Sequence, residues 1–389
     1  MPTQDLTFRP ALRDLGLTIG RFPTGPSNAI TDLKGVRVGH VTHIQDDVPV
    51  PGTDTRTKVR TGVTAVLPAA GDVYNNRLAA GGFVLNGVGD MTGLNQVLEW
   101  GWLETPILLT NTMSVGRVHA GTVLSMMKRY PKLGLRSDVI LPVVGETDDS
   151  FLNDARIPAN TEDDAVRAIL SARSGPVTQG SVGAGTGMMT FDFAGGIGTS
   201  SRVVDLGPDS YLVGVLVLSN FGRMRNLTVE GAVVGRELDR LLSGKGRRED
   251  SYGSVIVVVG TNAPLLSSQL NRVSKRAALG LGRVGSHAAS TSGEIVVAFS
   301  TRNRSPRHQL GKRRYLLQHF ISDVFVNELY EATIEATEEA VLNAISTSAG
   351  TDGRAGHRAR ALPVDKVFEI LRRGRRLKAL ARLPQPTRP

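Results

Sequence analysis

The feature that most constrains the fold is an alternation of short apolar runs with amphipathic stretches, separated by glycine-rich turns, along the 389 residues. The apolar runs predict strands at 62–67, 105–109, 139–144, 211–218, 255–259 and 295–299. The amphipathic stretches predict helices at 91–100, 122–129, 162–171, 265–279 and 323–346, the first and third of them after the candidate N-caps Asp90 and Thr161. Alternating strands and helices favour a layered α/β fold.

Composition excludes several kinds of site. The chain has no cysteine, so disulfides, cysteine-based metal sites and a thiol nucleophile are ruled out. The seven histidines form no HxH or HExxH pair, so we expect no metal and no cofactor. A basic-then-apolar leader and an uninterrupted apolar run of about 18 residues are both missing from the sequence. We therefore expect a cytoplasmic protein without a membrane span.

The net charge of +10 comes from one end of the chain. From Arg354 onwards, eleven lysines and arginines face only Asp365 and Glu369, so the remainder is close to neutral. A charge confined to a tail says little about a site in the body of the protein. We expect a solvated, partly helical basic tail and no nucleic-acid partner.

The segment SYGSVIVVVGTNAPL, residues 251–265, joins a polar loop to the most apolar strand of the chain. The loop at 242–253 mixes charges with glycines, which predicts an exposed, mobile segment. It would offer the Gly253–Ser254 bond for self-cleavage, whereas the simpler interpretation is a serine that merely opens a strand. A cleaved chain would give Ser254 both a hydroxyl and an α-amine of ordinary pKa near 7.7–8.0. That amine could act as the base, which would remove the need for a histidine.

Two glycine clusters resemble nucleotide sites without meeting their requirements. GLGRVG, residues 280–285, follows a helical run and precedes a strand, the reverse of the dinucleotide-binding order, so close packing of a turn explains it better. GSVGAGTGMM, residues 180–189, could cradle an anion through backbone amides but lacks the Lys-Ser/Thr of a phosphate-binding loop. We expect a turn near the active cleft.

Ten ordered stretches together resemble the L-aminopeptidase/D-esterase family, which also holds the β-peptidyl aminopeptidases. They span roughly residues 10 to 376 and include NAITDLKGVRVGHVTH from Asn28, GGFVLNGVGDMTG from Gly81, LPVVGETDDSFLND from Leu141, LVLSNFG from Leu216, GSVIVVVGTNAPLL from Gly253 and STSGEIVVAFST from Ser290. The resemblance implies a four-layer αββα sandwich, self-cleaved into two associated subunits, residues 1–253 and residues 254–389. It also implies a homo-oligomer of these processed pairs.

The resemblance assigns the centre of the site to four residues. Ser254, first after Gly253, matches the nucleophile, and Ser292 and Glu294 match a serine and an acid that orient its hydroxyl or amine. Asn220 matches a donor to the oxyanion. Without the resemblance, Ser292 and Glu294 would be interpreted as a strand cap, and Asn220 equally well as a turn residue.

A fifth residue, Glu146, matches an acid that binds the free ammonium group of a substrate, although its sequence context also fits a solvated loop acid. Asp148 stands where the family can place an aromatic residue, so this chain lacks a tyrosine hydroxyl there and carries an extra acid. The expected function is a serine aminopeptidase acting on short peptides, amides or esters through an acyl-enzyme. The alternatives are an acyltransferase of the ornithine acetyltransferase type, for which threonine is expected at the cleavage point, and a non-catalytic peptide-binding relative.

Overall fold

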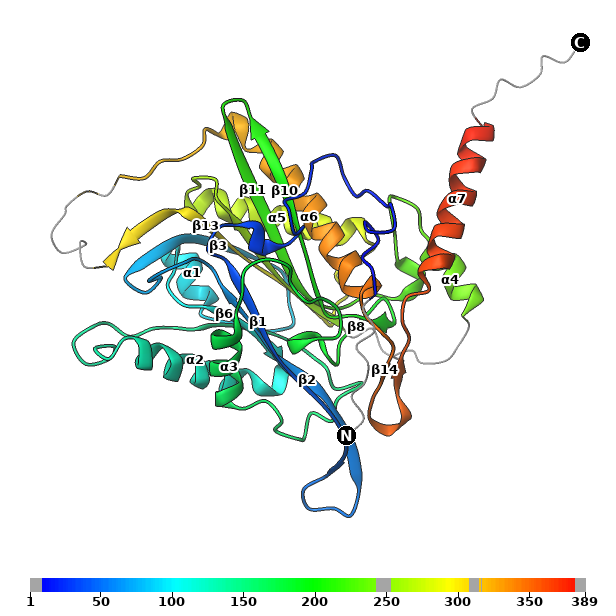
Figure 1. Cartoon of the computed structure of the whole chain (residues 1–389), viewed down its shortest axis with the longest axis horizontal. Helices are drawn as coiled ribbons and strands as arrows, with labels where there is room; N and C mark the ends of the chain where they lie inside the picture. The colour runs from blue at the N-terminus through cyan, green and yellow to red at the C-terminus, as the bar shows by residue number, and fades with distance from the viewer. Residues whose placement is uncertain (1–8, 243–252, 308–314, 316, 382–389) are drawn as a thin grey trace, which may run out of the picture.

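The structure is a computed structural model and describes residues 9–242, 253–307, 315 and 317–381. Two large sheets form the centre of the mixed α/β fold (Figure 1). In the first sheet the strand order is β1-β2-β6-β7-β4. Its strands are β1 (Arg37–Pro49), β2 (Arg56–Leu67), β6 (Ile107–Asn111), β7 (Val143–Thr147) and β4 (Met91–Thr92).

The second sheet has the order β10-β11-β12-β13-β3-β5. Its strands are β10 (Ile197–Leu206), β11 (Asp209–Asn220), β12 (Gly253–Thr261), β13 (Ser292–Pro306), β3 (Asn76–Gly87) and β5 (Trp102–Leu103). Strands β12 and β13 run parallel, and each has an antiparallel neighbour on its other side, β11 and β3 respectively. Strands that follow the predicted cleavage point are thus flanked by strands that precede it.

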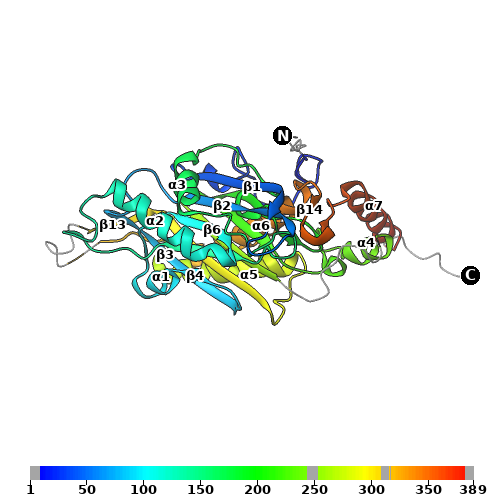
Figure 2. The same cartoon turned by 90° about the horizontal axis from the view of Figure 1, so that it is seen from below.

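Each sheet has its own pair of long helices. Helices α2 (Val115–Arg129) and α3 (Glu162–Ser171) contact the first sheet, and α5 (Ser267–Arg283) and α6 (Asn327–Ser346) contact the second. The shorter α1 (Leu94–Trp100) packs on β3. Helices α4 (Gly235–Leu241) and α7 (Val364–Ala381) lie together at one end of the molecule (Figure 2). Four further short strands are β8 (Met189–Thr190), β9 (Phe193–Ala194), β14 (Thr351–Asp352) and β15 (Arg358–Ala359).

Strand β12 lies at the centre of the core because both of its faces are apolar. Val255 and Val257 belong to the cluster that includes residues of α5 and α6, whereas Ile256 belongs to the cluster between the two sheets. A Cβ placed on Gly145 of β7 would stand 3.0 Å from the Ile256 side chain, so the two sheets approach closely here. Burial on both faces explains why this segment is an almost unbroken run of valine and isoleucine.

Several predicted element boundaries require correction. The helix expected over 91–100 begins at Leu94 with Gly93 as its N-cap, because Met91–Thr92 pairs with β7 and Asp90 does not cap it. The helix expected from residue 122 begins at Val115. The strand expected over 139–144 begins only at Val143. By contrast, α3 spans the predicted residues, and the Thr161 hydroxyl accepts a hydrogen bond from the backbone N–H of Asp164, as an N-cap should.

The two glycine clusters have structural roles. Gly280 and Gly282 lie inside α5, so the expected turn is confined to Gly285, which has a φ of 105°. A Cβ on Gly280 would meet Thr337 of α6 at 2.6 Å, so this glycine allows two helices to pack closely. The predicted loop at 242–253 falls mostly on residues 243–252, which lie outside the described residues. Across the described parts of the chain, no helix is both long and apolar enough to cross a membrane.

Candidate active site

Ser254 is the second residue of β12 and is 7% exposed. It lies opposite Asn220, the last residue of β11, and on its other side opposite Gly293 of β13. Because side chains alternate along a strand, Ser254 shares a face with Ile256 and is directed toward the first sheet. Gly253 precedes it at a point of close approach, since a Cβ there would stand 2.9 Å from the Cα of Phe221.

Two backbone groups fix the side-chain amide of Asn220, which is fully buried. Its Oδ1 accepts a hydrogen bond from the backbone N–H of Met189 at 3.0 Å. Its Nδ2 donates to the backbone carbonyl of Asp148 at 2.7 Å. The amide nitrogen is therefore directed to the loop that follows β7, beside Ser254. Met189 belongs to the glycine-rich cluster at 180–189, so this cluster does lie next to the candidate site.

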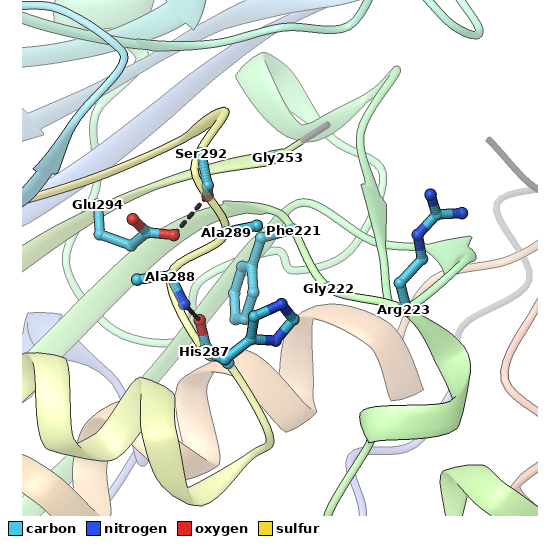
Figure 3. A pocket seen from close by; sticks show the side chains of 10 residues that line it. Phe221, Gly222, Arg223, Gly253, His287, Ala288, Ala289, Ser292 and Glu294 are labelled. Atoms are coloured by element: carbon cyan, nitrogen blue, oxygen red, sulfur yellow. Dashed lines mark hydrogen bonds between the residues drawn. The ribbon is translucent and has the colours of Figure 1, made fainter. Parts of the chain in front are cut away.

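Ser292 and Glu294 form a buried pair at the start of β13 (Figure 3). Ser292 lies in register with Gly253, and its hydroxyl donates to Glu294 Oε1. Glu294 Oε2 is buried and has no hydrogen-bond partner among the described residues. Burial raises the pKa of the Glu294 carboxyl, and the hydrogen bond from Ser292 partly opposes the rise. The pair is thus close to the bond expected to break, with one carboxylate oxygen left to accept a donor.

A small pocket of about 20 Å³ opens beside this pair. Its wall includes Gly253, Ser292 and Glu294 together with Phe221, Arg223 and His287 (Figure 3). The volume suits about one water molecule. The pocket therefore places the candidate catalytic pair beside Gly253, the residue before the expected cleavage point.

Glu146 approaches the same place from the first sheet, where it is the fourth residue of β7 and 4% exposed. Its Oε1 accepts from the backbone N–H of Asp90 at 2.9 Å, and its Oε2 accepts from the hydroxyl of Thr112. A Cβ on Gly89 would stand 3.2 Å from Glu146 Oε1 and 3.5 Å from the Cα of Gly293. Only a glycine separates this carboxylate from the strand position paired with Ser254.

The electrostatics of Glu146 resemble those of Glu294. Burial raises the pKa of the Glu146 carboxyl; the hydrogen bonds from Thr112 and Asp90 oppose the rise, and the charges of Asp148 and Asp90 add to it. Neither Glu146 nor Glu294 forms a salt bridge with a lysine, arginine or histidine of the described residues. The described residues also contain no group of three or more histidine, cysteine, aspartate or glutamate side chains that could hold a metal ion.

Sequence reasoning missed the polar residues that support this site. Asp149 is 1% exposed and accepts hydrogen bonds from Asn111 and Asn153. Thr112, which follows Asn111 at the end of β6, donates to Glu146. The available signal was a cluster of polar residues directly after two apolar strands, LLTNT and VVGETDD, which end side by side because β6 and β7 are parallel.

Comparison with known proteins identifies the class as a hydrolase that acts on peptide bonds. The chain belongs to peptidase family S58, whose family model matches residues 28–359. This confirms the family and the type of enzyme that the sequence predicted.

Three relatives resemble the chain along nearly its whole length. The β-peptidyl aminopeptidase BapA of Sphingosinicella xenopeptidilytica is 40% identical over 377 residues, which cover 93% of this chain and 91% of the relative. The PH0078 protein of Pyrococcus horikoshii OT3 is 42% identical, with a TM-score of 0.86, over 94% of this chain and 99% of that one. The L-aminopeptidase D-Ala-esterase/amidase of Ochrobactrum anthropi is 38% identical, with a TM-score of 0.86, over 95% and 100%. That enzyme is described as a prototype of the serine aminopeptidases and a variant of the Ntn hydrolase fold.

Proposed function

We propose that this chain is a self-processing serine aminopeptidase with Ser254 as its nucleophile, acting on the amino-terminal residue of short peptides, amides or esters. The observation that carries the proposal is the position of Ser254. It is buried at the head of β12, directly after a closely packed glycine, and lies opposite Asn220. Its relatives include enzymes described as a β-peptidyl aminopeptidase and an L-aminopeptidase.

In the processing step, the Ser254 hydroxyl attacks the carbonyl carbon of Gly253. The peptide C–N bond breaks as an ester to the Ser254 oxygen forms, and the nitrogen leaves as the free α-amine of Ser254. Water then hydrolyses the ester and releases the Gly253 carboxylate. The products are residues 1–253 and residues 254–389, the second of which begins with the nucleophile and ends in the basic tail.

The sheet order supports two fragments that stay associated. Strands β12 and β13 belong to the second fragment and are hydrogen-bonded to β11 and β3 of the first. Separation would expose two strand edges and the apolar core on both faces of β12. We infer that the two sheets and their covering helices form a four-layer αββα sandwich, which stays intact after the break.

During turnover, the freed amine of Ser254 takes the proton of its own hydroxyl as this attacks the substrate carbonyl. Ser292 is in register with Gly253 and can hydrogen-bond that amine, and Glu294 orients the Ser292 hydroxyl. The amide of Asn220 donates to the oxygen that develops negative charge. The leaving amine departs as the acyl-enzyme forms, and water releases the acid.

Glu146 supplies the selectivity for a free amino group. Its carboxylate is buried, reaches toward the strand position beside Ser254 and has no cationic partner in the described chain. A substrate ammonium would provide that charge, whereas a blocked amine would leave the carboxylate unpaired. We also infer a homo-oligomer of processed pairs, as the resemblance to the L-aminopeptidase/D-esterase family implies.

Mass spectrometry of the purified protein, with amino-terminal sequencing of each fragment, tests the proposal. We expect two fragments, the second beginning at Ser254, and hydrolysis of aminoacyl amides. Ser254→Ala should leave a single chain without activity, because it removes the attacking hydroxyl. Ser219→Ala is the matched control, since Ser219 is a buried serine of β11 that hydrogen-bonds Thr190 at 2.7 Å on the opposite strand face, and this variant should be cleaved.

An unbroken yet fully active wild-type chain would contradict the proposal, as would cleavage or turnover by Ser254→Ala. The same preparation distinguishes the acyltransferase alternative. Transfer of the acyl group to an added amine in preference to water would favour it, and an intact chain that binds peptides without turnover would favour a non-catalytic relative.

A further inference from the structure

The loop after β7 carries a buried acid, Asp149, to which the mechanism above assigns no role. Its carboxylate accepts from Asn111 Nδ2 at 2.9 and 3.1 Å and from Asn153 Nδ2 at 3.0 Å, and the hydroxyl of Thr61 also hydrogen-bonds it. It forms no ion pair with any described cation. Burial raises its pKa to about 6. An unpaired buried carboxylate disfavours its own charged form, so here its contacts come from neutral hydrogen-bond donors.

A first series of contacts joins Asp149 to Asn220, the expected oxyanion donor. The adjacent residue, Asp148, offers its backbone carbonyl to Asn220 Nδ2 at 2.7 Å. The backbone N–H groups of Leu152 and Asn153 donate hydrogen bonds to the Asp149 carbonyl at 3.1 and 2.9 Å, so the loop forms a turn that begins at Asp149. The position of the Asp148 carbonyl, and with it the direction of the Asn220 amide, depends on how this turn is held.

A second path leads from Asp149 to the acid expected to bind the substrate ammonium. Asn111, which donates to both Asp149 oxygens, is the last residue of β6. The next residue, Thr112, donates its hydroxyl to Glu146 Oε2. Asp149 therefore lies between the two groups that would contact opposite ends of the reacting unit, Asn220 at the carbonyl oxygen and Glu146 at the ammonium.

The outer side of the same loop is held by residues that follow the predicted cleavage point. Arg354 Nε donates to the carbonyl of Ser150 at 2.6 Å. The His357 ring lies 4.2 Å from that of Phe151 and hydrogen-bonds its carbonyl oxygen. With its outer side fixed in this way, the loop can respond to a change at Asp149 mainly on its inner side, where it meets Asn220.

We propose that Asp149 is a positioning residue that sets the direction of the Asn220 amide and of Glu146 through the polar contacts of the 148–153 loop and Asn111. The proposal rests on the proposed function, because Asn220 and Glu146 take their roles from it. It assigns Asp149 no contact with the substrate.

A double-mutant cycle tests the path to Asn220. We would measure kcat and KM of the processed protein on an aminoacyl anilide for Asp149→Asn, Asn220→Ala and the double variant. Loss of an oxyanion donor lowers kcat by about 10²- to 10³-fold, and we expect Asp149→Asn to lower it about tenfold or more. If Asp149 acts through Asn220, adding Asp149→Asn to Asn220→Ala should change kcat by less than about threefold.

Asp164→Asn provides a matched control. Asp164 is also 1% exposed, and its carboxylate accepts a hydrogen bond within its own turn from the backbone N–H of Thr161, but it lies on α3 and forms a salt bridge with Arg167. It should affect thermal stability without changing kcat, and its effects should add to those of Asn220→Ala. If Asp149→Asn yields no folded protein, Asn111→Ser removes the two contacts of the Asn111 amide with Asp149 while it keeps the Asp149 charge and the contact from Asn153. It should show the same lack of additivity with Asn220→Ala.

The outcomes distinguish a failure of the proposed role of Asp149 from a failure of the proposed function. A processed, active wild type with kcat losses that multiply in the double variant would overturn the role of Asp149 and leave the proposed function standing. So would an Asp149→Asn variant with wild-type kcat. An inactive, unprocessed wild type would overturn the proposed function and this inference together.

Discussion

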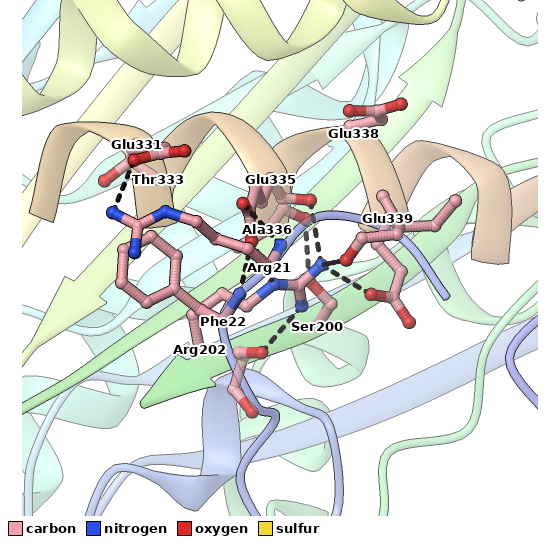
Figure 4. Close-up of polar contacts among 12 residues, drawn as sticks. Arg21, Phe22, Ser200, Arg202, Glu331, Thr333, Glu335, Ala336, Glu338 and Glu339 are labelled. Atoms are coloured by element: carbon pink, nitrogen blue, oxygen red, sulfur yellow. Dashed lines mark hydrogen bonds and ion pairs between the residues drawn. The ribbon is translucent and has the colours of Figure 1, made fainter. Parts of the chain in front are cut away.

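Two groups of buried acids in this molecule differ in whether a cationic side chain faces them. On α6, Glu335 and Glu339 face Arg202 of β10, which is fully buried, at 3.1 and 2.6 Å (Figure 4). Arg13 adds a second contact to Glu339 at 2.6 Å. Around Ser254, Glu146, Asp149 and Glu294 are equally buried but form no salt bridge within the described residues.

The pKa directions follow from this difference. Burial acts to raise the pKa of Glu339, but the hydrogen bond from Arg13 and the charge of Arg202 outweigh it, so the pKa is lowered. For Glu146, Asp149 and Glu294, burial prevails and the pKa is raised. Shifted, unpaired acids gathered at one place are typical of a reacting site, whereas matched pairs are typical of structural cores. Buried acids are therefore salt-bridged in one region, whereas in the other they lack a cationic partner among the described residues.

The largest loss of stability should come from removing one acid of the salt-bridged group. Glu339→Gln removes the charge that faces Arg202 and Arg13 and should lower the free energy of unfolding by about 3–5 kcal/mol, because a fully buried arginine loses one of its two carboxylates. Urea unfolding in the Ser254→Ala background would measure this on a single uncleaved chain. The kcat of the processed Glu339→Gln protein should stay close to that of the wild type.

Glu331→Gln serves as the comparison for that variant. Glu331 contacts Arg21 at 2.7 Å, but both side chains are largely exposed, so a much smaller loss of stability is expected. Equal losses for Glu331→Gln and Glu339→Gln would mean that burial does not distinguish the two pairs. A large drop in kcat for Glu339→Gln would mean that the two regions are not independent.

The stability that Asp149 contributes should change with pH in the opposite direction to the stability contributed by a salt-bridged carboxylate. The pKa of Asp149 is about 6 in the folded protein, above its ordinary 3.8, so the folded state holds the proton to higher pH than the unfolded chain does. The stability that this group contributes is thus fully present below about pH 4 and is lost as the pH rises to about 6, by at most about 3 kcal/mol. The charge of Asp148 acts in the same direction as a smaller effect.

Comparison with Asp149→Asn isolates this group, because the other raised acids, Glu146 and Glu294, are common to both proteins. In the Ser254→Ala background, urea unfolding at about pH 4 and about pH 7 should show the wild-type residue losing stability relative to asparagine. Parallel stability profiles for the two proteins would show that Asp149 keeps an ordinary pKa.

The parts of the fold that could be predicted from the sequence are those in which one segment carries its own signal. Strand β12 is apolar on both faces, and α3 has its own N-cap in Thr161, so both were located correctly. The start of α2 was missed because it contains Gly116 and Gly121. A Cβ on Gly121 would meet the carbonyl of Glu162 at 2.2 Å, so this glycine reflects packing against α3 and not a turn.

The candidate site, like the fold, could be predicted from the sequence only in part. Ser254, Asn220, Ser292, Glu294 and Glu146 could be proposed because each lies in a stretch that resembles a known family. Asp149 lies in one of these stretches as well, but its role could not be proposed, because its partners Thr61 and Asn111 come from distant parts of the chain and meet it only in the folded protein. A network assembled by tertiary structure leaves no periodic pattern in the sequence.

The smallest predicted effect is that of Glu146→Gln on kcat/KM. It tests directly whether an unpaired buried acid binds the ammonium group of the substrate. Glu146→Gln keeps the shape of the side chain but removes its charge. It should lower kcat/KM for a substrate with a free amine by about tenfold to hundredfold, through the loss of one charge-assisted hydrogen bond. Turnover of the matching ester with a blocked amine should change by less than about threefold, since that substrate brings no cation to pair. Asp90→Asn is the control, because it keeps the backbone N–H that donates to Glu146 and removes only the smaller effect of the Asp90 charge. Equal losses on both substrates would show that Glu146 supports the site without binding the ammonium group.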